Sequence, residues 1–359
     1  MVKNGWKRII EGRTVGHAAA RWLLKGFSLP YLAGAQAKNY MYDRGRRTIH
    51  RLPARVISVG NLSVGGTGKT PLTLALARYY KNAGVPAAIV SRGYGGSAER
   101  ECVVASDGVE VFHGPGRVGD EPYLLAKISG VPVLVGGDRV KSGREACLRF
   151  GAQVILLDDG FQHRRLARDL DLVLLDARKS LKREWVLPAG TLREPLRALK
   201  RAHALILTRY DDGPVGRKNR ELLERRFPDV SLFVAEHRPE KFIVGNEETT
   251  LERIQGRKAV AFSGLGANEP FFETVRSLGA EVRAAIGFDD HHVYTGADVQ
   301  RLASLQRRLN AEVMVTTDKD AVKLAQLNDP DFTPWVLRIG FHILENEDSF
   351  FRFVTNELV

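Results

Sequence analysis

A glycine-rich segment placed directly after a short apolar run constrains the fold of this chain more than any other sequence feature. Val56 to Val59 form a run typical of a buried strand, Gly-Gly-Thr-Gly-Lys-Thr follows at 65–70, and Pro71 opens a stretch with helical character. This strand–loop–helix order is the context in which a phosphate-binding P-loop occurs. The segment therefore predicts a nucleoside triphosphate site.

The chemistry of the loop fits phosphate binding. Glycines lack a Cβ, so main-chain N–H groups can converge on phosphate oxygens, and the N-terminus of the following helix adds a positive dipole end. Lys69 is expected to reach the β- and γ-phosphates, and the Thr70 hydroxyl to bind Mg²⁺. Ser63 stands where the usual pattern has its first glycine, so a glycine-rich turn without a ligand is the alternative. The predicted nucleotide-binding residues are Gly65, Gly66, Thr67, Gly68, Lys69 and Thr70.

A second chemical signal lies about ninety residues further on. The apolar run 153–157 ends in Asp158-Asp159-Gly160. An apolar strand that ends in carboxylates is the Walker B arrangement, which would place Asp158 or Asp159 beside Mg²⁺. A plain β-turn at Asp-Asp-Gly is the alternative.

Strand and helix patterns alternate through most of the chain, and the strands are nearly continuous apolar runs. Such strands favour a parallel sheet covered by helices on both faces. The predicted class is α/β: a P-loop NTPase-like parallel sheet, a second and smaller Rossmann-like α/β lobe, and an N-terminal membrane-associating helix. Further candidate strands are 87–91, 131–135, 172–176, 204–208, 231–235, 258–263, 281–286 and 312–316, and 101–112 alternates like a hairpin.

The expected domains follow from charge and from breaks in this alternation. Residues 1–54 form a basic segment, 55–198 the P-loop core with a proline- and glycine-containing linker at 186–199, and 199–338 the second lobe. Residues 339–359 form a C-terminal segment that could pack back on the core. Ser263-Gly264-Leu-Gly266 resembles a dinucleotide fingerprint without its third glycine, which favours a tight turn.

The positive charge is concentrated at the N-terminus. Residues 1–55 hold twelve Lys/Arg and two acids, giving +10, so the remaining 304 residues carry 12 − 10 = +2. Arg13, His17, Arg21 and Lys25 recur every four residues and would form one polar stripe of a helix. The longest uncharged run within residues 1–55, 26–37, has twelve residues and is too short to span a bilayer, which needs about 20. A helix in the headgroup plane of an anionic membrane fits better, with a helix packed on its own core as the alternative.

Several residues remain open on sequence grounds alone. Arg92 follows a predicted strand and could meet a phosphate or lie on the surface. Asp120 precedes a predicted helix with an early proline, so it could act simply as the N-cap. Cys102 and Cys147 give neither a disulfide framework nor a zinc spacing, which favours a reducing cytosolic location.

Taken together, these stretches resemble the tetraacyldisaccharide 4′-kinase (lipid A 4′-kinase) family, in which a hydroxyl residue is tolerated at the position of Ser63. The stretches that carry the resemblance are Ser-Val-Gly-Asn-Leu-Ser-Val-Gly-Gly-Thr-Gly-Lys-Thr-Pro at 58–71, Ser-Arg-Gly-Tyr-Gly-Gly at 91–96, Gly-Asp-Glu-Pro at 119–122, Leu-Asp-Asp-Gly-Phe-Gln-His at 157–163, Leu-Pro-Ala-Gly-Thr-Leu-Arg-Glu-Pro at 187–195, Asp-His-His at 290–292 and Thr-Asp-Lys-Asp-Ala-Val-Lys at 317–323.

The resemblance implies a kinase that transfers the γ-phosphoryl of ATP, with Mg²⁺, to the 4′-hydroxyl of a tetraacylated glucosamine disaccharide 1-phosphate. It implies Asp120 as the catalytic carboxylate working with His291, for which His292 is the competitor. It also implies that Asp158, Asp159 and Glu194 lie near the metal and nucleotide. Arg92, Arg139 and His163 are weaker candidates for substrate binding.

The partners implied are the lipid disaccharide and the anionic surface of the inner membrane, on whose cytoplasmic face the protein would be peripheral or monotopic. No obligate protein partner and no nucleic acid are expected, because the body of the chain is nearly neutral and lacks a basic strand rich in aromatic residues. A regulatory P-loop NTPase is the other alternative. Its GTPase form is disfavoured because the Asn-Lys-x-Asp motif is absent.

Overall fold

The computed structural model describes residues 15–245, 247–290, 292–327 and 329–355. These residues form two compact units, each assembled from separate stretches of chain. Unit 1 comprises the described parts of Met1–Lys69, Gln153–Glu236 and Ile343–Val359, and unit 2 those of Thr70–Ala152 and His237–His342.

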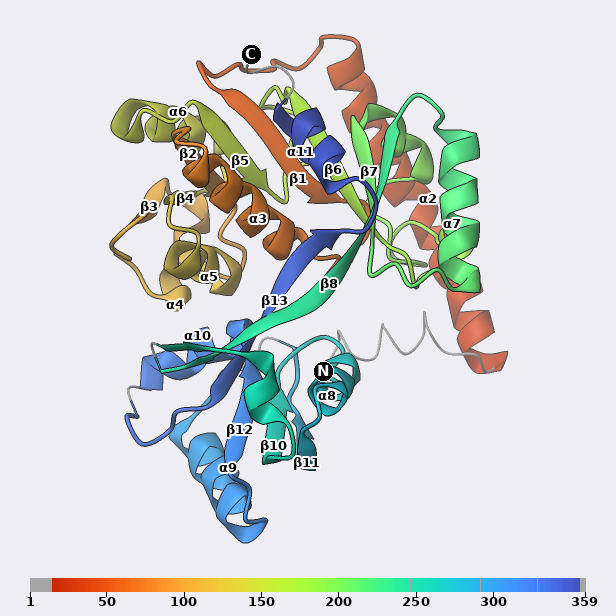
Figure 1. The fold of residues 1–359 in the computed structure, drawn as a ribbon. Coiled ribbons are helices and arrows are strands. Elements are labelled where there is room, and N and C mark those ends of the chain that lie inside the picture. Colours follow the sequence, from red (N-terminus) through yellow and green to blue (C-terminus); the bar gives the residue numbers. More distant parts are fainter. Residues whose placement is uncertain (1–14, 246, 291, 328, 356–359) are drawn as a thin grey trace. The chain divides into compact units, whose positions relative to one another are not determined.

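Unit 1 is built on a parallel sheet. Its strands lie in the order β8-β7-β6-β1-β5 (Figure 1), and each strand pairs in parallel with its neighbours in this order. All residues of β5, β6 and β7 are buried, as expected for a parallel sheet with both faces covered. The strand bounds are β1 Arg55–Asn61, β5 Val154–Asp158, β6 Leu170–Asp176, β7 Ala204–Thr208 and β8 Ser231–Val244, of which the residues up to Glu236 belong to this unit.

Helices α2 (Val15–Asp43), α7 (Pro214–Arg226) and α11 (Glu347–Thr355) belong to unit 1, together with the short 3₁₀ turns Leu181–Arg183 and Leu196–Arg201. A single apolar cluster joins β6 and β7 to α7 through Val173, Leu205 and Leu223. Phe350 of α11 is fully buried, and its ring meets that of Phe233 edge-to-face with centroids 5.1 Å apart. The C-terminal helix is therefore part of the core of unit 1.

Unit 2 contains two groups of strands. In the first, β2 (Ala87–Ser91) pairs in parallel with β4 (Pro132–Val135), which pairs antiparallel with β3 (Val103–Asp107). The helices of this part are α3 (Lys69–Asn82, which starts at the last residue of unit 1), α4 (Pro115–Val118), α5 (Asp120–Ile128) and α6 (Arg139–Phe150), with a 3₁₀ turn at Ser97–Arg100.

The second group of unit 2 is a parallel sheet in the order β11-β10-β12-β13, and β13 lies beside β8. Along β10, Ala259 and Ala261 enter one apolar cluster while Val260 and Phe262 enter another, so both faces are covered. The bounds are β10 Lys258–Ser263, β11 Glu281–Gly287, β12 Val313–Thr317, β13 Trp335–Ile343, the short β9 Glu247–Thr249, α8 Glu269–Ser277, α9 Gly296–Arg308 and α10 Asp318–Leu324, with 3₁₀ turns at Leu251–Ile254 and Ala325–Leu327.

The α/β class with parallel strands covered by helices is confirmed. The two units divide the chain differently from the expected domains, however. β7 (Ala204–Thr208), expected to open a second lobe, pairs in parallel with β6 of unit 1. The expected linker 186–199 contributes Val186, Leu192 and Leu199 to the same apolar cluster. A continuous apolar strand identifies a buried position but carries no information about its neighbours, so sequence could not assign β7 to its sheet.

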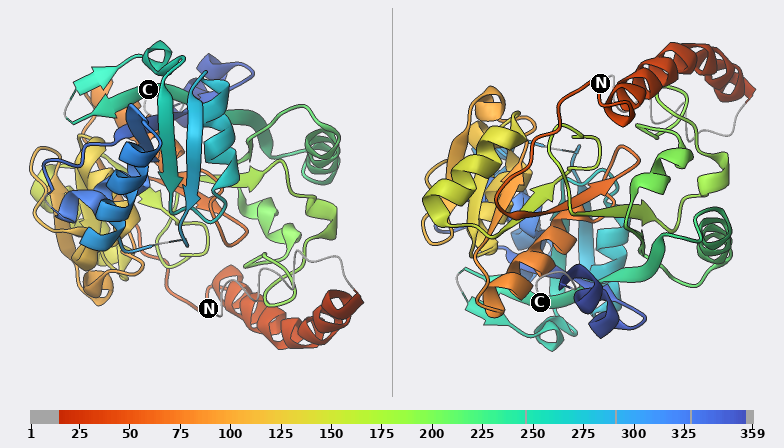
Figure 2. Two further views of the ribbon diagram at one scale, coloured as in Figure 1. Left: turned by 90° about the horizontal axis from the view of Figure 1, so that it is seen from below. Right: turned by 90° about the horizontal axis from the view of Figure 1, so that it is seen from above.

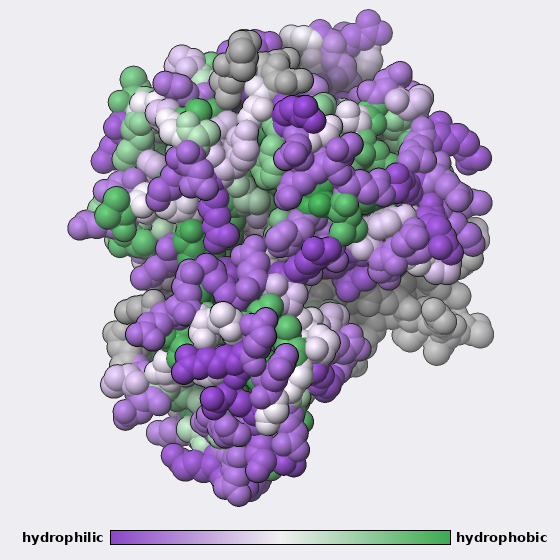
Figure 3. Space-filling model, viewed as in Figure 1, coloured by the Kyte–Doolittle hydropathy of each residue, from purple (hydrophilic) through white to green (hydrophobic). Residues whose placement is uncertain are grey.

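No helix among the described residues is long and apolar enough to cross a membrane. Hydrophilic residues predominate on the face shown in Figure 3, with hydrophobic residues scattered among them.

Candidate functional site

The glycine-rich loop between β1 and α3 has the local geometry of a P-loop. Gly65 and Gly68 adopt φ angles of 109° and 92°, a region that favours glycine. Apart from the chain neighbours, a Cβ added at Gly65 or Gly66 would meet no atom of the described residues within 4 Å, and both glycines are exposed. Gly66 is therefore not required by protein packing, and its backbone is accessible to a ligand.

Side chains from β1 and β7 hold this loop from behind. The Asn61 amide donates to Thr67 Oγ1 at 3.0 Å and to the Gly65 carbonyl at 3.3 Å, and Thr67 is nearly fully buried. The Thr208 hydroxyl at the end of β7 donates to the Thr67 carbonyl at 2.9 Å. Thr67 thus serves as an anchor of the loop.

A third support comes from a buried ion pair that sequence reasoning missed. Arg209 donates to the Gly66 carbonyl at 2.7 Å and to Asp176 Oδ2 at 2.8 Å. Arg178 forms two further bonds to Asp176, each 3.1 Å long. Burial raises the pKa of Asp176, but the hydrogen bond from Arg178 and the charge of Arg209 outweigh it and hold the pKa below its ordinary value. Asp176 thereby holds Arg209 in the position from which it binds the Gly66 carbonyl.

Lys69 is the first residue of α3, two residues before the expected start at Pro71, and its ammonium lies near one of the two predicted aspartates. Lys69 Nζ is 3.5 Å from Asp159 Oδ1. Arg193 Nη1 contacts the same carboxylate at 2.8 and 3.0 Å, so Asp159 is shared by two cations. Asp158 is the last residue of β5 and is buried. Arg193 lies in the stretch 187–195 that carries the family resemblance. Its position in the sequence gave no reason to expect a contact with Asp159.

Glu194, which the family resemblance implies to lie near the metal and nucleotide, accepts hydrogen bonds from two neighbouring side chains. Arg201 donates to its two oxygens at 3.1 and 2.9 Å, and the Asn39 amide of α2 donates to Oε2 at 2.6 Å. Among the described residues, no group of three or more His, Cys, Asp or Glu side chains is arranged to hold a metal ion. Glu194 is thus held in a salt bridge that fixes the 193–194 segment.

Helix α2 is fixed to the same segment by polar groups. The Ser28 hydroxyl donates to the Val186 carbonyl and accepts the Ala189 N–H, both at 3.1 Å, and Tyr31 donates to the Arg193 carbonyl at 3.0 Å. Figure 2 shows α2, in red, along this side of unit 1. Three of its large apolar side chains are exposed: Trp22, Leu23 and Phe27 are 72%, 74% and 69% exposed.

Asp120 is the first residue of α5, and the N-cap position belongs to Gly119, whose φ is 91°. The structure therefore does not place Asp120 as the cap. Its carboxylate lies 3.2 Å from the ammonium of Lys323 in α10, and that lysine is 5% exposed. The contact joins residues 203 positions apart, which is why sequence spacing could not reveal it.

The predicted partner His291 lies outside the described residues. Its competitor His292 is held by neighbours: Nε2 is 3.2 Å from Asp298 Oδ2, and the ring stacks on Phe288 with centroids 4.5 Å apart. Burial raises the pKa of Asp298, and hydrogen bonds from Thr295 and His292 outweigh this and lower it. His292 thus has a structural role in this loop.

The weaker candidates are placed as follows. Arg92 forms an ion pair with Glu99 at the surface. Arg139 is buried at the start of α6 and donates to the Gly137 carbonyl at 3.2 Å. The His163 N–H donates to the Gly160 carbonyl at 2.8 Å, which places it in the turn after the paired aspartates.

The segment 263–266, expected to form a tight turn, is a bend that connects β10 to α8. The Gly264 N–H donates to both oxygens of Asp320, each at 3.1 Å, and Asp320 is fully buried. That amide is occupied by the protein's own carboxylate.

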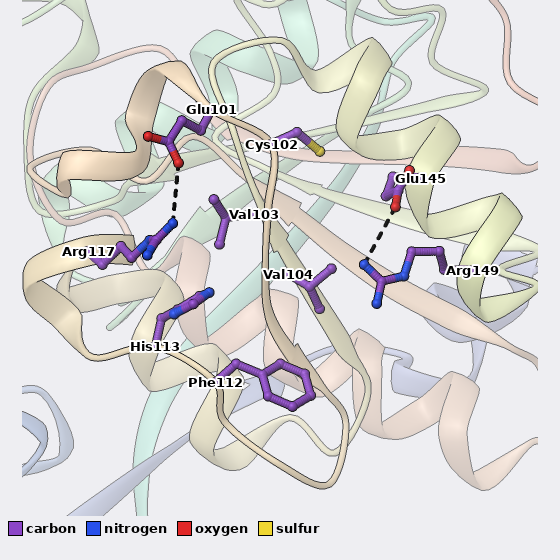
Figure 4. A pocket seen from close by; sticks show the side chains of 9 residues that line it. All are labelled: Glu101, Cys102, Val103, Val104, Phe112, His113, Arg117, Glu145 and Arg149. Atoms are coloured by element: carbon purple, nitrogen blue, oxygen red, sulfur yellow. Dashed lines mark hydrogen bonds and ion pairs between the residues drawn. The ribbon is translucent and has the colours of Figure 1, made fainter.

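A cavity of about 440 Å³ lies in unit 2 beside β3 and α6 (Figure 4). Two ion pairs, Glu101–Arg117 and Glu145–Arg149, line it, so its charges are balanced. It contains none of the predicted site residues, and we assign it no part in the chemistry.

Comparison with known proteins agrees with this geometry. A family model described as "Tetraacyldisaccharide-1-P 4'-kinase" matches residues 20–359. The tetraacyldisaccharide 4′-kinase of Syntrophus aciditrophicus is 42% identical over 323 residues, covering 85% of this chain and 84% of the relative. That of Syntrophobacter fumaroxidans is 42% identical over 342 residues, covering 93% and 87%. The crystal structure of "apo" form LpxK from Aquifex aeolicus in complex with ATP is similar with a TM-score of 0.77 at 32% identity, covering 94% of this chain and 99% of that one.

Proposed function

The chain belongs to the tetraacyldisaccharide-1-P 4′-kinase family, and from this premise we propose how its residues perform the reaction. It is a kinase that uses ATP to phosphorylate the 4′-hydroxyl of a tetraacylated glucosamine disaccharide 1-phosphate, the lipid A precursor. We propose the roles of individual residues, the binding of Mg²⁺ and the association with the membrane.

The donor side of the reaction is assigned to the P-loop. The N–H groups of the loop and the ammonium of Lys69 hold the ATP phosphates and stabilise the charge that develops on the γ-phosphoryl group. The open space beside Gly65 and Gly66 supports this assignment, because a Cβ there would obstruct only a ligand. Asn61, Thr208 and Arg209 keep the loop preorganised.

Mg²⁺ is assigned to Thr70 with Asp158 and Asp159, because Mg²⁺ prefers hydroxyl, carboxylate and phosphate oxygens. When bound, the ion neutralises charge on the β- and γ-phosphates. Arg193 steadies the Asp159 carboxylate that Lys69 approaches. Glu194 is assigned to the scaffold of the site, because its oxygens already accept bonds from Arg201 and Asn39.

The acceptor side is assigned to Asp120, with His291 as its partner on the basis of the family pattern. The Asp120 carboxylate accepts the proton of the 4′-hydroxyl, whose oxygen forms the new bond to the γ-phosphorus. The bond between that phosphorus and the β–γ bridging oxygen breaks, and ADP leaves. Arg92, Arg139 and His163 remain candidates for contacts with anionic groups of the substrate.

The membrane is the proposed location of the lipid substrate. Helix α2 presents Trp22, Leu23 and Phe27 outward and is attached to the protein by hydroxyl and amide groups. A helix with exposed apolar residues, within a segment of charge +10, suits the surface of an anionic bilayer. We place the protein peripherally on the cytoplasmic face of the inner membrane.

The observation that carries this proposal is Lys69 at the start of α3, with its ammonium 3.5 Å from Asp159. Purified protein is incubated with γ-labelled ATP, Mg²⁺ and the tetraacyl disaccharide 1-phosphate in detergent. The parent protein should label the lipid, and Lys69→Ala should lose turnover by about 10²-fold or more, because a donor aimed at developing charge is removed.

The matched control is Lys81→Ala, an exposed lysine in the last turn of the same helix, which should leave turnover unchanged. Near-normal turnover of Lys69→Ala would refute the nucleotide assignment. Label released as inorganic phosphate, with none on the lipid, would favour a regulatory NTPase.

A further inference from the structure

Lys323 is a buried lysine that the mechanism above leaves without a role. It lies near the end of α10 with 5% of its side chain exposed. Its ammonium is 3.2 Å from Asp120 Oδ2 and donates to the His292 carbonyl at 3.1 Å. Lysines are almost never fully buried unless paired, because an ammonium loses its hydration when it leaves water. The position therefore depends on these two partners.

The helix that carries Lys323 is itself held rigidly. Asp320, one turn earlier, accepts the Gly264 N–H at 3.1 Å and the Thr317 hydroxyl at 2.6 Å, and it is fully buried. Helices α10 and α5 pack on one another within unit 2. A rigid α10 fixes where the ammonium stands, and the ammonium then fixes the carboxylate at the start of α5.

We propose that Lys323 is a positioning residue for phosphoryl transfer, which holds the Asp120 carboxylate ionised and in one orientation and ties it to the loop that carries the Asp-His-His sequence. The inference rests on the role of Asp120 proposed above. The same ammonium contacts the Asp120 carboxylate and the His292 carbonyl, so it joins the start of α5 to the loop in which Asp290 and His292 lie.

The other charged groups around this contact have partners of their own. Lys319 of α10 lies 3.3 Å from Asp290, and His292 lies 3.2 Å from Asp298. Asp320 is occupied by Gly264 and Thr317. Among the described groups named here, Lys323 forms the ion pair with Asp120, at 3.2 Å.

The chemistry accounts for a cation beside a base. An opposite charge within about 4 Å favours the ionised carboxylate, so the base is available at lower pH although it is weaker. Phosphoryl transfer through a loose transition state relies on positioning and charge stabilisation more than on a strong base. The rate gained when Lys323 orients Asp120 and keeps it ionised is therefore expected to exceed the rate lost because Asp120 becomes a weaker base.

The first test is the pH dependence of kcat and kcat/KM for the parent, Lys323→Met and Lys323→Arg. Lys323→Met should lower kcat by about 10-fold or more and move the acid limb to higher pH by about one unit, because the neighbouring charge is lost. Lys323→Arg should keep the acid limb near that of the parent. KM for ATP should change little, because the P-loop holds the nucleotide.

The matched control is Lys241→Met, which removes a lysine from a surface pair with Glu248 in the same unit and should leave the pH profile unchanged. An acid limb that stays in place in Lys323→Met would overturn the inference. A merely structural lysine would lower activity at all pH values without moving the limb.

The second test combines Lys323→Met with Asp120→Asn. Asp120→Asn leaves the buried ammonium of Lys323 without its carboxylate partner. The single variant Asp120→Asn should therefore have a lower Tm than the double variant. Turnover of the double variant should be no lower than that of Asp120→Asn, because residues that act as a unit are non-additive. Further loss in the double variant would overturn the inference.

The two proposals fail in different ways. Normal turnover of Asp120→Asn would refute Asp120 as the base, and the inference about Lys323 with it. An inactive Asp120→Asn together with an unshifted Lys323→Met profile would refute the role of Lys323 alone.

Discussion

Asp176 shows how one buried carboxylate can govern a ligand loop that it does not touch. It binds Arg209, which donates to the Gly66 carbonyl, and Arg178 holds it from the other side. Replacement by asparagine keeps the shape of the side chain but leaves two guanidinium groups without their counter-ion. We expect Asp176→Asn to lower the free energy of unfolding at pH 7 by about 1–3 kcal/mol, since hydrogen bonds to charged groups contribute this much.

The pH dependence of that difference follows from the pKa of Asp176, which is lowered from 3.8 in the folded protein. The carboxylate contributes its full stabilisation above the unfolded pKa and loses it as pH falls through the folded pKa. Denaturation of parent and variant at pH 7 and at successively lower pH should therefore show the gap closing below about pH 4. A gap that stays constant would contradict the assignment.

Individual residues show where sequence reasoning reached its limit. That Lys69 lies at a helix start and Asp158 at a strand end could be predicted, because each lies within a few positions of a recognisable strand or glycine loop. Lys323 could not be connected with Asp120, because the contact spans 203 positions and depends on how α10 packs on α5. Asp120 at a helix start suggested a cap, and the positive φ of Gly119 moved the cap one residue earlier.

At the scale of elements, α2 exposes several of its largest apolar side chains, while Ser28 and Asn39 bond to the protein and Leu32 packs on the core of unit 1. Trp22→Ser with Phe27→Ser should weaken binding to anionic liposomes by about 10-fold or more, since each exposed apolar side chain loses its transfer into the bilayer interface. Sedimentation with liposomes measures the effect. ATP binding, measured by thermal shift, should be unchanged.

The control is Leu148→Ser on α6, which removes an apolar side chain that is 83% exposed. It should leave liposome binding at the level of the parent. Equal binding by the α2 variant and the parent would favour the alternative of a helix that packs only on its own protein.

Elements with a strong local pattern were predictable, and their pairings were not. The expected strands 87–91 and 258–263 match β2 and β10 to the residue. The expected helix after Pro71 runs over Lys69–Asn82, so only its bounds changed. The expected strand 231–235 continues to Val244 through Pro239, because the extension depends on neighbouring strands that local sequence does not specify.

For the molecule as a whole, nucleotide binding should appear as added stability. ATP with Mg²⁺ at one hundred times Kd stabilises the folded state by about 2.7 kcal/mol and should raise Tm by several degrees. A chelator should reduce this rise, because the phosphates then lack the ion that Asp158 and Asp159 help to hold. The measurement is a melting curve with ATP, with and without EDTA, and equal rises would contradict the metal proposal.

The discontinuous make-up of the two units sets the order in which the chain can finish folding during synthesis. Unit 1 begins with the first described residues, yet its core includes Phe350 and Val354 of α11, both fully buried. The unit that carries Lys69 therefore remains incomplete on the ribosome until α11 has emerged. A premature stop after His342 would leave unit 2 with its full sequence and would instead expose the core beside the P-loop sheet, so the truncated product should aggregate rather than persist as a shorter kinase.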